Sequence, residues 1–239
     1  MNLIIDQGNT LFKAALFIDN ELISKSKFTY LDVDLFYVWL EEKNVKELNI
    51  IVSSVVSQTI DLSNILSNKV VYLDQMTELP IVNGYFTPET LGDDRIANAV
   101  AANSLNPNQN SLIIDFGTCI KYDLVNSMGI YLGGNISLGL NMRYKALNHF
   151  TDQLPLLKPS EFNNSHGVDT ESSIKCGVQL AIMHEINGFI DSYTQEFKQL
   201  TIFMTGGDLK YFDKSVKYHI FANSNLTLIG LNEILRHNA

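Results

Sequence analysis

The chain has 239 residues, 46% of them hydrophobic, which is enough to bury one large core or two smaller ones. Its formal net charge is −9 with no visible cluster of lysine and arginine, which argues against a nucleic-acid-binding surface. The two cysteines, Cys119 and Cys176, form no CxxC motif. Asp6 interrupts the first apolar run early, and no apolar run of the sequence approaches membrane-spanning length. We therefore expect a cytoplasmic protein with no disulfide framework, zinc site, signal peptide or membrane partner.

The first half of the chain begins with strands and continues with alternating helices and strands. We expect β-strands over residues 2–6, 11–18, 21–29, 48–53 and 69–73. An amphipathic helix is expected over residues 32–43, with Asp32 as a candidate N-cap. Residues 75–92 contain two prolines and a central glycine and predict a loop, and a helix follows over Asp93–Leu105.

The second half repeats this plan after a predicted linker at Asn106–Asn110, which we take as the expected boundary. We expect β-strands over residues 111–115, 119–126, 129–133, 200–204 and 218–221. A helix is expected directly after a turn at Gly133-Gly134, and further helices over residues 171–197 and 224–237. The 171–197 helix carries an apolar stripe at steps of three or four residues, which indicates core packing in preference to a subunit interface.

Two segments of the chain are nearly alike: LIIDQGNTLFKAALF near the N-terminus and LIIDFGTCIKYDLV midway. Each is an apolar run, then an aspartate, a glycine in a polar turn, and a second apolar run. A β-hairpin of this kind offers backbone N–H groups to a phosphate and a carboxylate to its metal ion. Two such hairpins facing each other can hold a nucleotide polyphosphate from both sides.

This doubled arrangement resembles the actin-like ATPases. The resemblance implies an α/β fold with two actin-like (ribonuclease H-like) lobes, each a mixed β-sheet with flanking helices. We expect the N-terminal lobe to span residues 1–110 and the C-terminal lobe residues 111–239.

In the first hairpin, Asp6 cannot touch a phosphate directly because like charges repel, so it would act through a magnesium ion or its waters. Gly8 permits close approach of the backbone, and Asn9 and Thr10 supply turn geometry and donors. Lys13, on the following strand, can neutralise a phosphate oxygen.

The second hairpin repeats the aspartate, glycine and hydroxyl positions at Asp115, Gly117 and Thr118. Gly206-Gly207 follows the strand LTIFMT. In the actin-like group, a glycine pair at such a place lets the backbone lie against the adenosine. A glycine pair alone is more often only a turn.

The segment GDDRIANAVAA at 92–102 places two carboxylates and an arginine where a helix begins. Asp94 could accept a hydroxyl proton as that hydroxyl attacks a γ-phosphate, and Arg95 could hold an anionic end of the substrate. The alternative is that Asp93 and Asp94 only favour the helix N-terminus electrostatically.

Together these motifs closely resemble the type III pantothenate kinases. Three motifs of that family are complete in this chain. They are D-x-G-N-[ST]-x-x-K over Asp6–Lys13, G-x-D-R at Gly92, Asp94 and Arg95, and D-x-G-T over Asp115–Thr118. Further family positions are matched by Tyr85, Asp123, Asp152–Pro155, Thr170, Gly177 and Thr205–Gly207. The resemblance spans nearly the whole chain, in the right order.

The resemblance implies ATP-dependent phosphorylation of pantothenate, the first step of coenzyme A biosynthesis, with Asp94 as the proton acceptor. It implies ATP contacts from Asp6, Gln7, Gly8, Asn9, Thr10, Leu11, Phe12, Lys13, Gly117, Thr118, Gly206 and Gly207. It implies pantothenate contacts from Tyr85, Gly92, Asp93, Asp94, Arg95 and Thr170. The threonine would come from the other subunit of a homodimer, which would put the long helix at the interface.

The resemblance also implies Mg²⁺, held by Asp6 through water, and a monovalent cation (K⁺ or NH₄⁺) with Asp115 among its ligands. Three positions depart from the family: Cys119 for alanine, Lys121 for threonine and Leu138 for proline. Lys121 could compete with the monovalent cation or replace it. The five histidines show no ligand spacing and are interpreted as surface or packing residues.

Two other functions remain open at this point. One is a catalytically weak accessory or regulatory homologue of the same fold, which loss of Asp6, Asp94 or Arg95 would favour. The other is a kinase for another small hydroxyl-bearing acid, which would share the two hairpins but not G-x-D-R with Tyr85 and Thr170.

Overall fold

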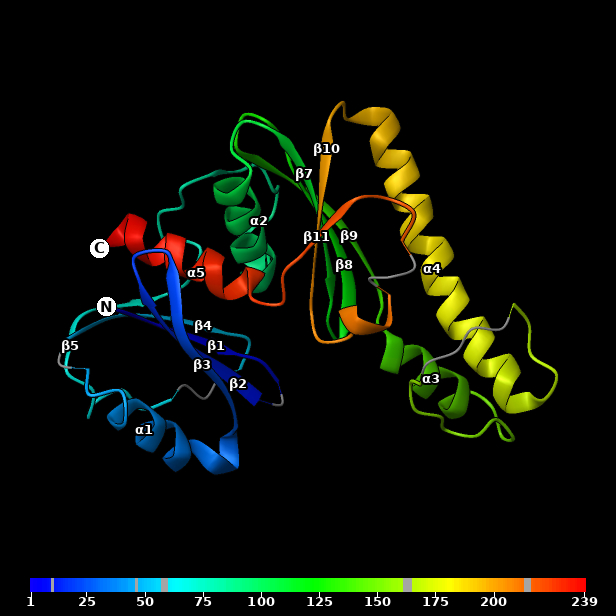
Figure 1. The fold of residues 1–239 in the computed structure, drawn as a ribbon, viewed down its shortest axis with the longest axis horizontal. Helices are drawn as coiled ribbons and strands as arrows, with labels where there is room; N and C mark the ends of the chain where they lie inside the picture. The colour runs from blue at the N-terminus through cyan, green and yellow to red at the C-terminus, as the bar shows by residue number, and fades with distance from the viewer. Residues whose placement is uncertain (10, 46, 57–59, 161–164, 213–215) are drawn as a thin grey trace. The chain divides into compact units, whose positions relative to one another are not determined.

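The computed structural model describes the chain except for residues 10, 46, 57–59, 161–164 and 213–215. It divides into two compact units, which we describe one at a time (Figure 1). The first unit comprises Met1–Leu105, Gly129–Tyr131 and Asn225–Ala239, and the second comprises Asn106–Met128 and Leu132–Ser224. The α/β class with mixed sheets and flanking helices is confirmed.

The sheet of the first unit has five strands in the order β3-β2-β1-β4-β5. Their bounds are Asn2–Gln7 for β1, Leu11–Ile18 for β2, Glu21–Thr29 for β3, Leu48–Ser54 for β4 and Ser67–Tyr72 for β5. β1, β2 and β3 pair antiparallel, whereas β4 runs parallel to β1 and β5 parallel to β4. The sheet is therefore mixed, and the carboxyl ends of β1 and β4 meet at one edge.

The α-helices of the first unit, over the residues that the structure describes, are α1 (Val33–Glu41), α2 (Asp93–Leu105) and α5 (Leu226–Asn238). α1 packs its buried Phe36 against Phe12 and Phe28 of the sheet. Asp32 occupies the N-cap position, but its carboxylate accepts a 2.6 Å hydrogen bond from Thr29 Oγ1 in place of capping the helix.

The C-terminal helix α5 does not follow the expected lobe division. We expected it in the C-terminal lobe of residues 111–239, but residues 225–239 group with the first unit. α5 packs closely on α2: a Cβ on Gly230 would lie 1.8 Å from the Ala97 carbonyl oxygen, so only glycine fits there. Thr227 Oγ1 donates a 2.9 Å hydrogen bond to Asn98 Oδ1 across the same pair of helices.

The predicted loop 75–92 contains two short elements. β6 (Val82–Asn83) pairs in parallel with Ile130 and Tyr131, and a 3₁₀ turn covers Pro88–Thr90. β6 could not be predicted from the sequence because a two-residue strand has no periodicity.

The second sheet has six strands in the order β11-β10-β7-β8-β9-β6. Its remaining bounds are Asn110–Phe116 for β7, Cys119–Val125 for β8, Ile130–Leu138 for β9, Leu200–Thr205 for β10 and Ile220–Ala222 for β11. β7 and β8 form the predicted second hairpin, and β10 lies parallel to β7.

The predicted turn at Gly133-Gly134 is wrong. β9 continues through both glycines to Leu138, and the helix α3 begins only at Leu140 and ends at His149. A Cβ on Gly134 would lie 1.7 Å from the Tyr122 carbonyl oxygen of β8. Gly134 therefore serves the close approach of two strands and not a turn.

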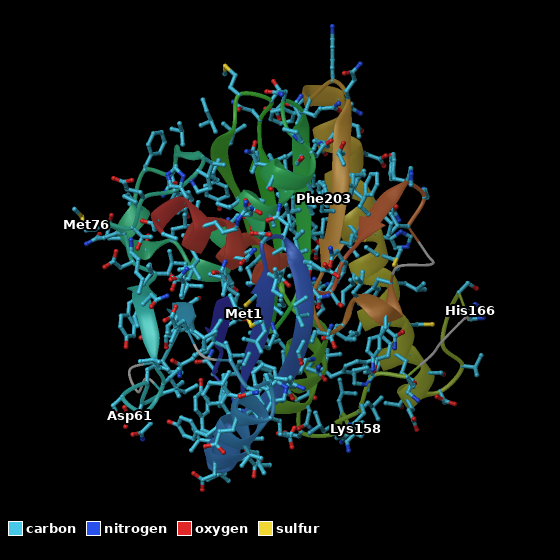
Figure 2. The ribbon with its side chains drawn as sticks, turned by 60° about the vertical axis from the view of Figure 1, so that its left-hand side comes forward. Met1, Asp61, Met76, Lys158, His166 and Phe203 are labelled. Carbon is cyan, nitrogen blue, oxygen red and sulfur yellow. The ribbon has the colours of Figure 1, made fainter. Side chains whose placement is uncertain are left out.

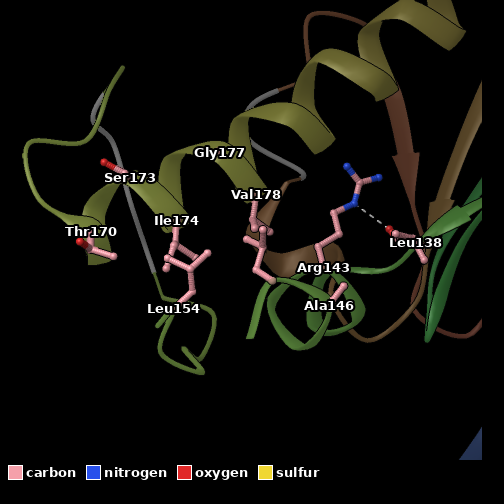
Figure 3. Close-up of a pocket in the computed structure, with 10 residues that line it drawn as sticks. Leu138, Arg143, Ala146, Leu154, Thr170, Ser173, Ile174, Gly177 and Val178 are labelled. Carbon is pink, nitrogen blue, oxygen red and sulfur yellow. Dashed lines mark hydrogen bonds between the residues drawn. The ribbon is translucent and has the colours of Figure 1, made fainter. Parts of the chain in front are cut away.

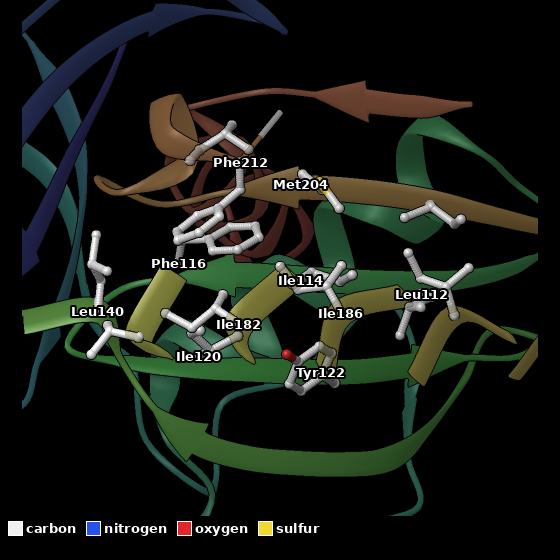
Figure 4. Close-up of a cluster of buried hydrophobic side chains, with 14 of the residues drawn as sticks. Leu112, Ile114, Phe116, Ile120, Tyr122, Leu140, Ile182, Ile186, Met204 and Phe212 are labelled. Atoms are coloured by element: carbon white, nitrogen blue, oxygen red, sulfur yellow. The ribbon is translucent and has the colours of Figure 1, made fainter. Parts of the chain in front are cut away.

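The long helix α4 (Thr170–Glu196) packs against the core of the second unit. Asp169 caps it through a capping box with Ser172, in which Ser172 N donates a 2.7 Å hydrogen bond to Asp169 Oδ1. Ile182 and Ile186 of the predicted stripe are fully buried among strand residues such as Ile114 (Figure 4). Core packing of the stripe is confirmed. Among the described residues, no helix has both the length and the apolar character needed to cross a membrane.

Candidate active site

The first hairpin places Asp6 and Lys13 opposite each other across the β1–β2 ladder. Lys13 Nζ lies 3.0 Å from Asp6 Oδ2, with 35% of the lysine side chain and 14% of the aspartate side chain exposed. Gly8 N donates to Leu11 O at 3.1 Å and closes the turn. Thr10 lies outside the described residues. The hairpin thus presents a carboxylate and an ammonium group beside a tight turn.

Two further residues of the predicted ATP segment are buried. Gln7 is 1% exposed, and Phe12 is fully buried in the aromatic core of the unit, so only the backbone of Phe12 is available to a ligand. Tyr30, which the sequence did not indicate, donates a 2.6 Å hydrogen bond from its hydroxyl to Gly8 O. Burial raises the pKa of the Tyr30 phenol, which keeps it a donor to the turn.

The carboxyl ends of β1 and β4 bring Asp6 and Ser53 together, because these two residues are partners in the parallel ladder. The start of α2 adds Asp93, whose Oδ2 lies 3.4 Å from Ser53 Oγ. A Cβ on Gly92 would come within 2.9 Å of Asp94 Oδ1, so the glycine leaves room for that carboxylate. Three carboxylates, Asp6, Asp93 and Asp94, therefore lie in one region of the first unit.

Burial raises the pKa of Asp93 to about 6, and the neighbouring carboxylates of Asp94 and Asp6 add to the rise. Hydrogen bonds from Ser54 N and Ser53 Oγ act in the opposite direction, because they favour the ionised form. Carboxyl groups with such raised pKa values are typical of functional sites. The sequence analysis missed both serines, although polar residues at the end of a predicted strand are a signal that could have found them.

Arg95 and Tyr85 form the other part of this group. Arg95 is 4% exposed, and its Cζ lies 5.6 Å from the centroid of the Tyr85 ring. Tyr85 in turn lies 6.1 Å from the ring of Tyr131, a residue that the sequence did not indicate. Tyr85 lies two residues beyond the end of β6, and its backbone N–H donates to Asn83 Oδ1 at 3.1 Å. β6 thus fixes the aromatic residue beside the arginine.

In the second unit, the hairpin of β7 and β8 places Lys121 opposite Asp115, with Nζ 2.8 Å from Oδ2. The turn is closed by Gly117 N donating to Cys119 O at 3.1 Å, and the Thr118 that follows Gly117 is exposed.

Gly206 is brought to the same hairpin, since β10 pairs with β7 and sets Thr205 opposite Asp115. Its φ is +101°, and a Cβ there would lie 2.5 Å from the backbone of Phe116. Asp208 N donates to Phe116 O at 3.1 Å and fixes the turn after Gly207. The structure therefore brings the glycine pair to the Asp115 hairpin, as a nucleotide site would require.

Thr170 lies elsewhere in the second unit, at the first position of α4. It lines a mostly apolar cavity of about 740 Å³ between α3 and α4 (Figure 3). Arg143 closes one end of the cavity, where its Nε donates to Leu138 O at 2.9 Å and its Nη2 to Glu185 Oε2. Leu138, one of the departures from the family, thus forms part of the cavity wall.

All five histidines are exposed; His166, for example, lies in the segment before α4 (Figure 2). In the described ranges there is no group of three or more histidine, cysteine, aspartate or glutamate side chains placed to hold a metal ion. A magnesium ion that keeps several waters and binds substrate phosphates needs only one or two carboxylates. Asp6 meets that lower requirement.

A family model described as type III pantothenate kinase matches residues 2–192. The chain belongs to the type III pantothenate kinase family. A type III pantothenate kinase of Christiangramia forsetii is 46% identical over 240 residues, with 100% of this chain and 99% of that protein covered. One of Bacteroides fragilis is 42% identical over 245 residues, with 100% and 98% covered.

Solved structures support the fold of this family member. A Campylobacter jejuni protein assigned to the Baf family of transcriptional activators has a TM-score of 0.62 at 19% identity, covering 99% of this chain and 98% of that one. Component A of the (R)-2-hydroxyglutaryl-CoA dehydratase of Acidaminococcus fermentans has a TM-score of 0.54 at 15% identity, covering 98% and 96%. A glucokinase from an Antarctic psychrotroph scores 0.51 at 13% identity, covering 100% and 99%. At these identities the likeness concerns the two-lobed actin-like fold alone.

Proposed function

We propose that this type III pantothenate kinase transfers the γ-phosphoryl group of ATP to the primary hydroxyl of pantothenate, giving 4′-phosphopantothenate for coenzyme A biosynthesis. The observation that carries the proposal is the convergence at one end of the first unit. The Asp6–Lys13 pair and the carboxylates at the start of α2 meet where β1 and β4 end. Phosphoryl transfer depends mainly on positioning and charge, and both are provided there.

The first hairpin suits the phosphates of ATP. The Gly8 turn allows close approach of the backbone, and the Lys13 ammonium can bind a phosphate oxygen. Asp6 is a hard oxygen donor and would hold Mg²⁺ through water, which supplies charge neutralisation at the phosphates. The second hairpin with Thr118 and the Gly206-Gly207 turn would bind the rest of the nucleotide.

Asp94 is the proposed general base. Its carboxylate takes the proton of the pantothenate hydroxyl as that oxygen bonds to the γ-phosphorus. The bond from the γ-phosphorus to its bridging oxygen breaks, and ADP leaves with the electron pair. Arg95 would hold the pantothenate carboxylate, with Tyr85 packed on its guanidinium.

The proposal includes a homodimer in which Thr170 contributes to the neighbouring subunit's site. Thr170 is exposed and adjoins the apolar cavity between α3 and α4, a surface suited to cover by another chain. Mixing inactive Thr170→Arg and Asp94→Asn chains would restore about a quarter of the wild-type activity per chain in a two-fold dimer, because each mixed dimer keeps one intact site. No recovery after verified subunit exchange would contradict it. We also propose a cytoplasmic location, where ATP is abundant.

Purified protein tests the function directly. ADP release should depend on pantothenate, and the product should be heavier by one phosphoryl group in a mass spectrum. Pantothenol, in which an alcohol replaces the carboxylate, should be a much poorer substrate because Arg95 would lose its partner. ADP release that pantothenate does not stimulate would reject the proposal and favour an accessory role.

A further inference from the structure

Lys121 stands where the family pattern resembled by this chain has threonine, and its ammonium forms an ion pair with Asp115. Nζ lies 2.8 Å from Asp115 Oδ2, and only 13% of the lysine side chain and 11% of the aspartate side chain are exposed. A charge pair so shielded from solvent is screened far less than a surface pair. The ammonium is therefore a fixed positive charge inside the second unit.

The backbone explains why Lys121 is held there. Lys121 and Asp115 are direct partners in the β7–β8 ladder, so their side chains leave the same face of the hairpin. The first hairpin repeats the pairing with Asp6 and Lys13. Lys121 is the more buried lysine of the two, with 13% of its side chain exposed against 35% for Lys13.

A monovalent cation at Asp115 does not fit this arrangement. A potassium or ammonium ion bound to the same carboxylate would stand within a few ångströms of the Lys121 ammonium. At such separations two like charges repel strongly when water does not lie between them. One carboxylate cannot offset both charges, so the two cations exclude each other.

We infer that the Lys121 ammonium replaces the monovalent cation at Asp115, so that this protein binds none there. The inference rests on the proposed function only where it concerns activity; the occupancy of the site is a separate property. A covalently attached cation is always present, whereas a free ion must be drawn from solution. The kinase should then work equally well in buffers without potassium or ammonium.

Cation binding can be measured without turnover. Equilibrium dialysis of the full-length protein with rubidium-86, a potassium substitute, should show no saturable binding with or without a non-hydrolysable ATP analogue. The melting temperature should be the same in potassium chloride and choline chloride at equal ionic strength. Lys121→Thr should gain rubidium binding approaching one ion per chain, and its melting temperature should rise with potassium to a plateau. Lys121→Arg, which keeps the charge, should bind none.

The matched control is Lys198→Thr, since Lys198 is an exposed lysine of the same unit outside the hairpin. It should behave like the wild type. Saturable rubidium binding by the wild type would overturn the inference, even if Lys121→Thr failed to fold. A folded Lys121→Thr that gains no binding would also overturn it. Pantothenate turnover by the wild type, measured in both salts, tests the proposed function separately: turnover only with potassium refutes the replacement, and no turnover in either salt refutes the kinase.

Discussion

Lys13 lies directly across the β1–β2 ladder from Asp6, with its Nζ 3.0 Å from Asp6 Oδ2. This pair stands beside the turn that closes between Gly8 and Leu11, on a partly exposed surface. Partly exposed ion pairs contribute about 0–1 kcal/mol to the free energy of unfolding. The pair therefore adds little to stability, and its proposed role is to bind the phosphates of ATP.

Lys13→Ala should raise the KM for ATP by roughly 10- to 100-fold, the range expected for loss of a charge-assisted hydrogen bond. Its melting temperature should change little. Lys27→Ala is the control, because Lys27 is exposed directly opposite Lys13 on β3. Steady-state kinetics and thermal melting check both variants. Loss of the cooperative transition in Lys13→Ala would mean that the lysine is structural.

Asp94→Asn should lower kcat by about a hundred- to ten-thousand-fold while ATP binding persists, because an amide cannot accept the hydroxyl proton. Asp93→Asn should cost much less. Single-turnover phosphoryl transfer and ATP binding by calorimetry separate the two effects. If Asp93→Asn proved the more damaging change, the base would be the carboxyl with the raised pKa and not Asp94.

Asp93 should also make the free energy of unfolding depend on pH. Its pKa is about 6 in the fold against 3.8 as the ordinary value, chiefly through burial. The folded state therefore holds this proton more tightly, and its contribution to stability is lost as pH rises from about 4 to about 6. Asp93→Asn should remove this loss and stabilise the protein at pH 7 by about 1 kcal/mol, after discounting for partial solvent exposure.

Urea unfolding at pH 4.5 and pH 7 measures this difference. Glu89→Gln is the control, since Glu89 is an exposed carboxylate of the same unit. It should leave the slope between the two pH values unchanged. The same slope in Asp93→Asn as in the wild type would show that Asp93 is not the titrating group.

Gly206→Ala should destabilise the protein by on the order of 2 kcal/mol or more, because φ is +101° and the new Cβ would meet the Phe116 backbone. Gly207→Ala should change little, since no atom lies within 4 Å of a Cβ built there. Thermal melting compares the two neighbours. Equal effects would show that the turn does not depend on the close contact with Phe116.

The sequence indicated most strands and both hairpins, because their apolar periodicity and turn residues are local signals. It placed the stripe of α4 in the core for the same reason. It missed the course of β9, because a glycine pair in a sequence usually indicates a turn. Only the structure shows that Gly134 is needed for a close approach to β8, where a Cβ would lie 1.7 Å from the Tyr122 carbonyl oxygen. Ser53 and Tyr131 were missed because they reach the site through strand pairing with distant residues.

The motifs of the site could be recognised in the sequence. The catalytic and binding roles of their residues remain predictions. The paired charges of the two hairpins follow from a short turn, so Asp6 and Lys13 could be anticipated. The raised pKa of Asp93 could not be anticipated, because it depends on burial in the folded unit and on the nearby carboxylates of Asp94 and Asp6.

The position of α5 has a consequence for the order in which the first unit can fold. Gly230 of α5 packs on Ala97, and Asn232 Oδ1 accepts a 2.8 Å hydrogen bond from Asn2 Nδ2. The unit that carries Asp6 and Asp94 therefore takes part of its core from a segment that follows the whole second unit in the chain. During synthesis the second unit can fold before this core is complete, whereas the first unit must wait for α5.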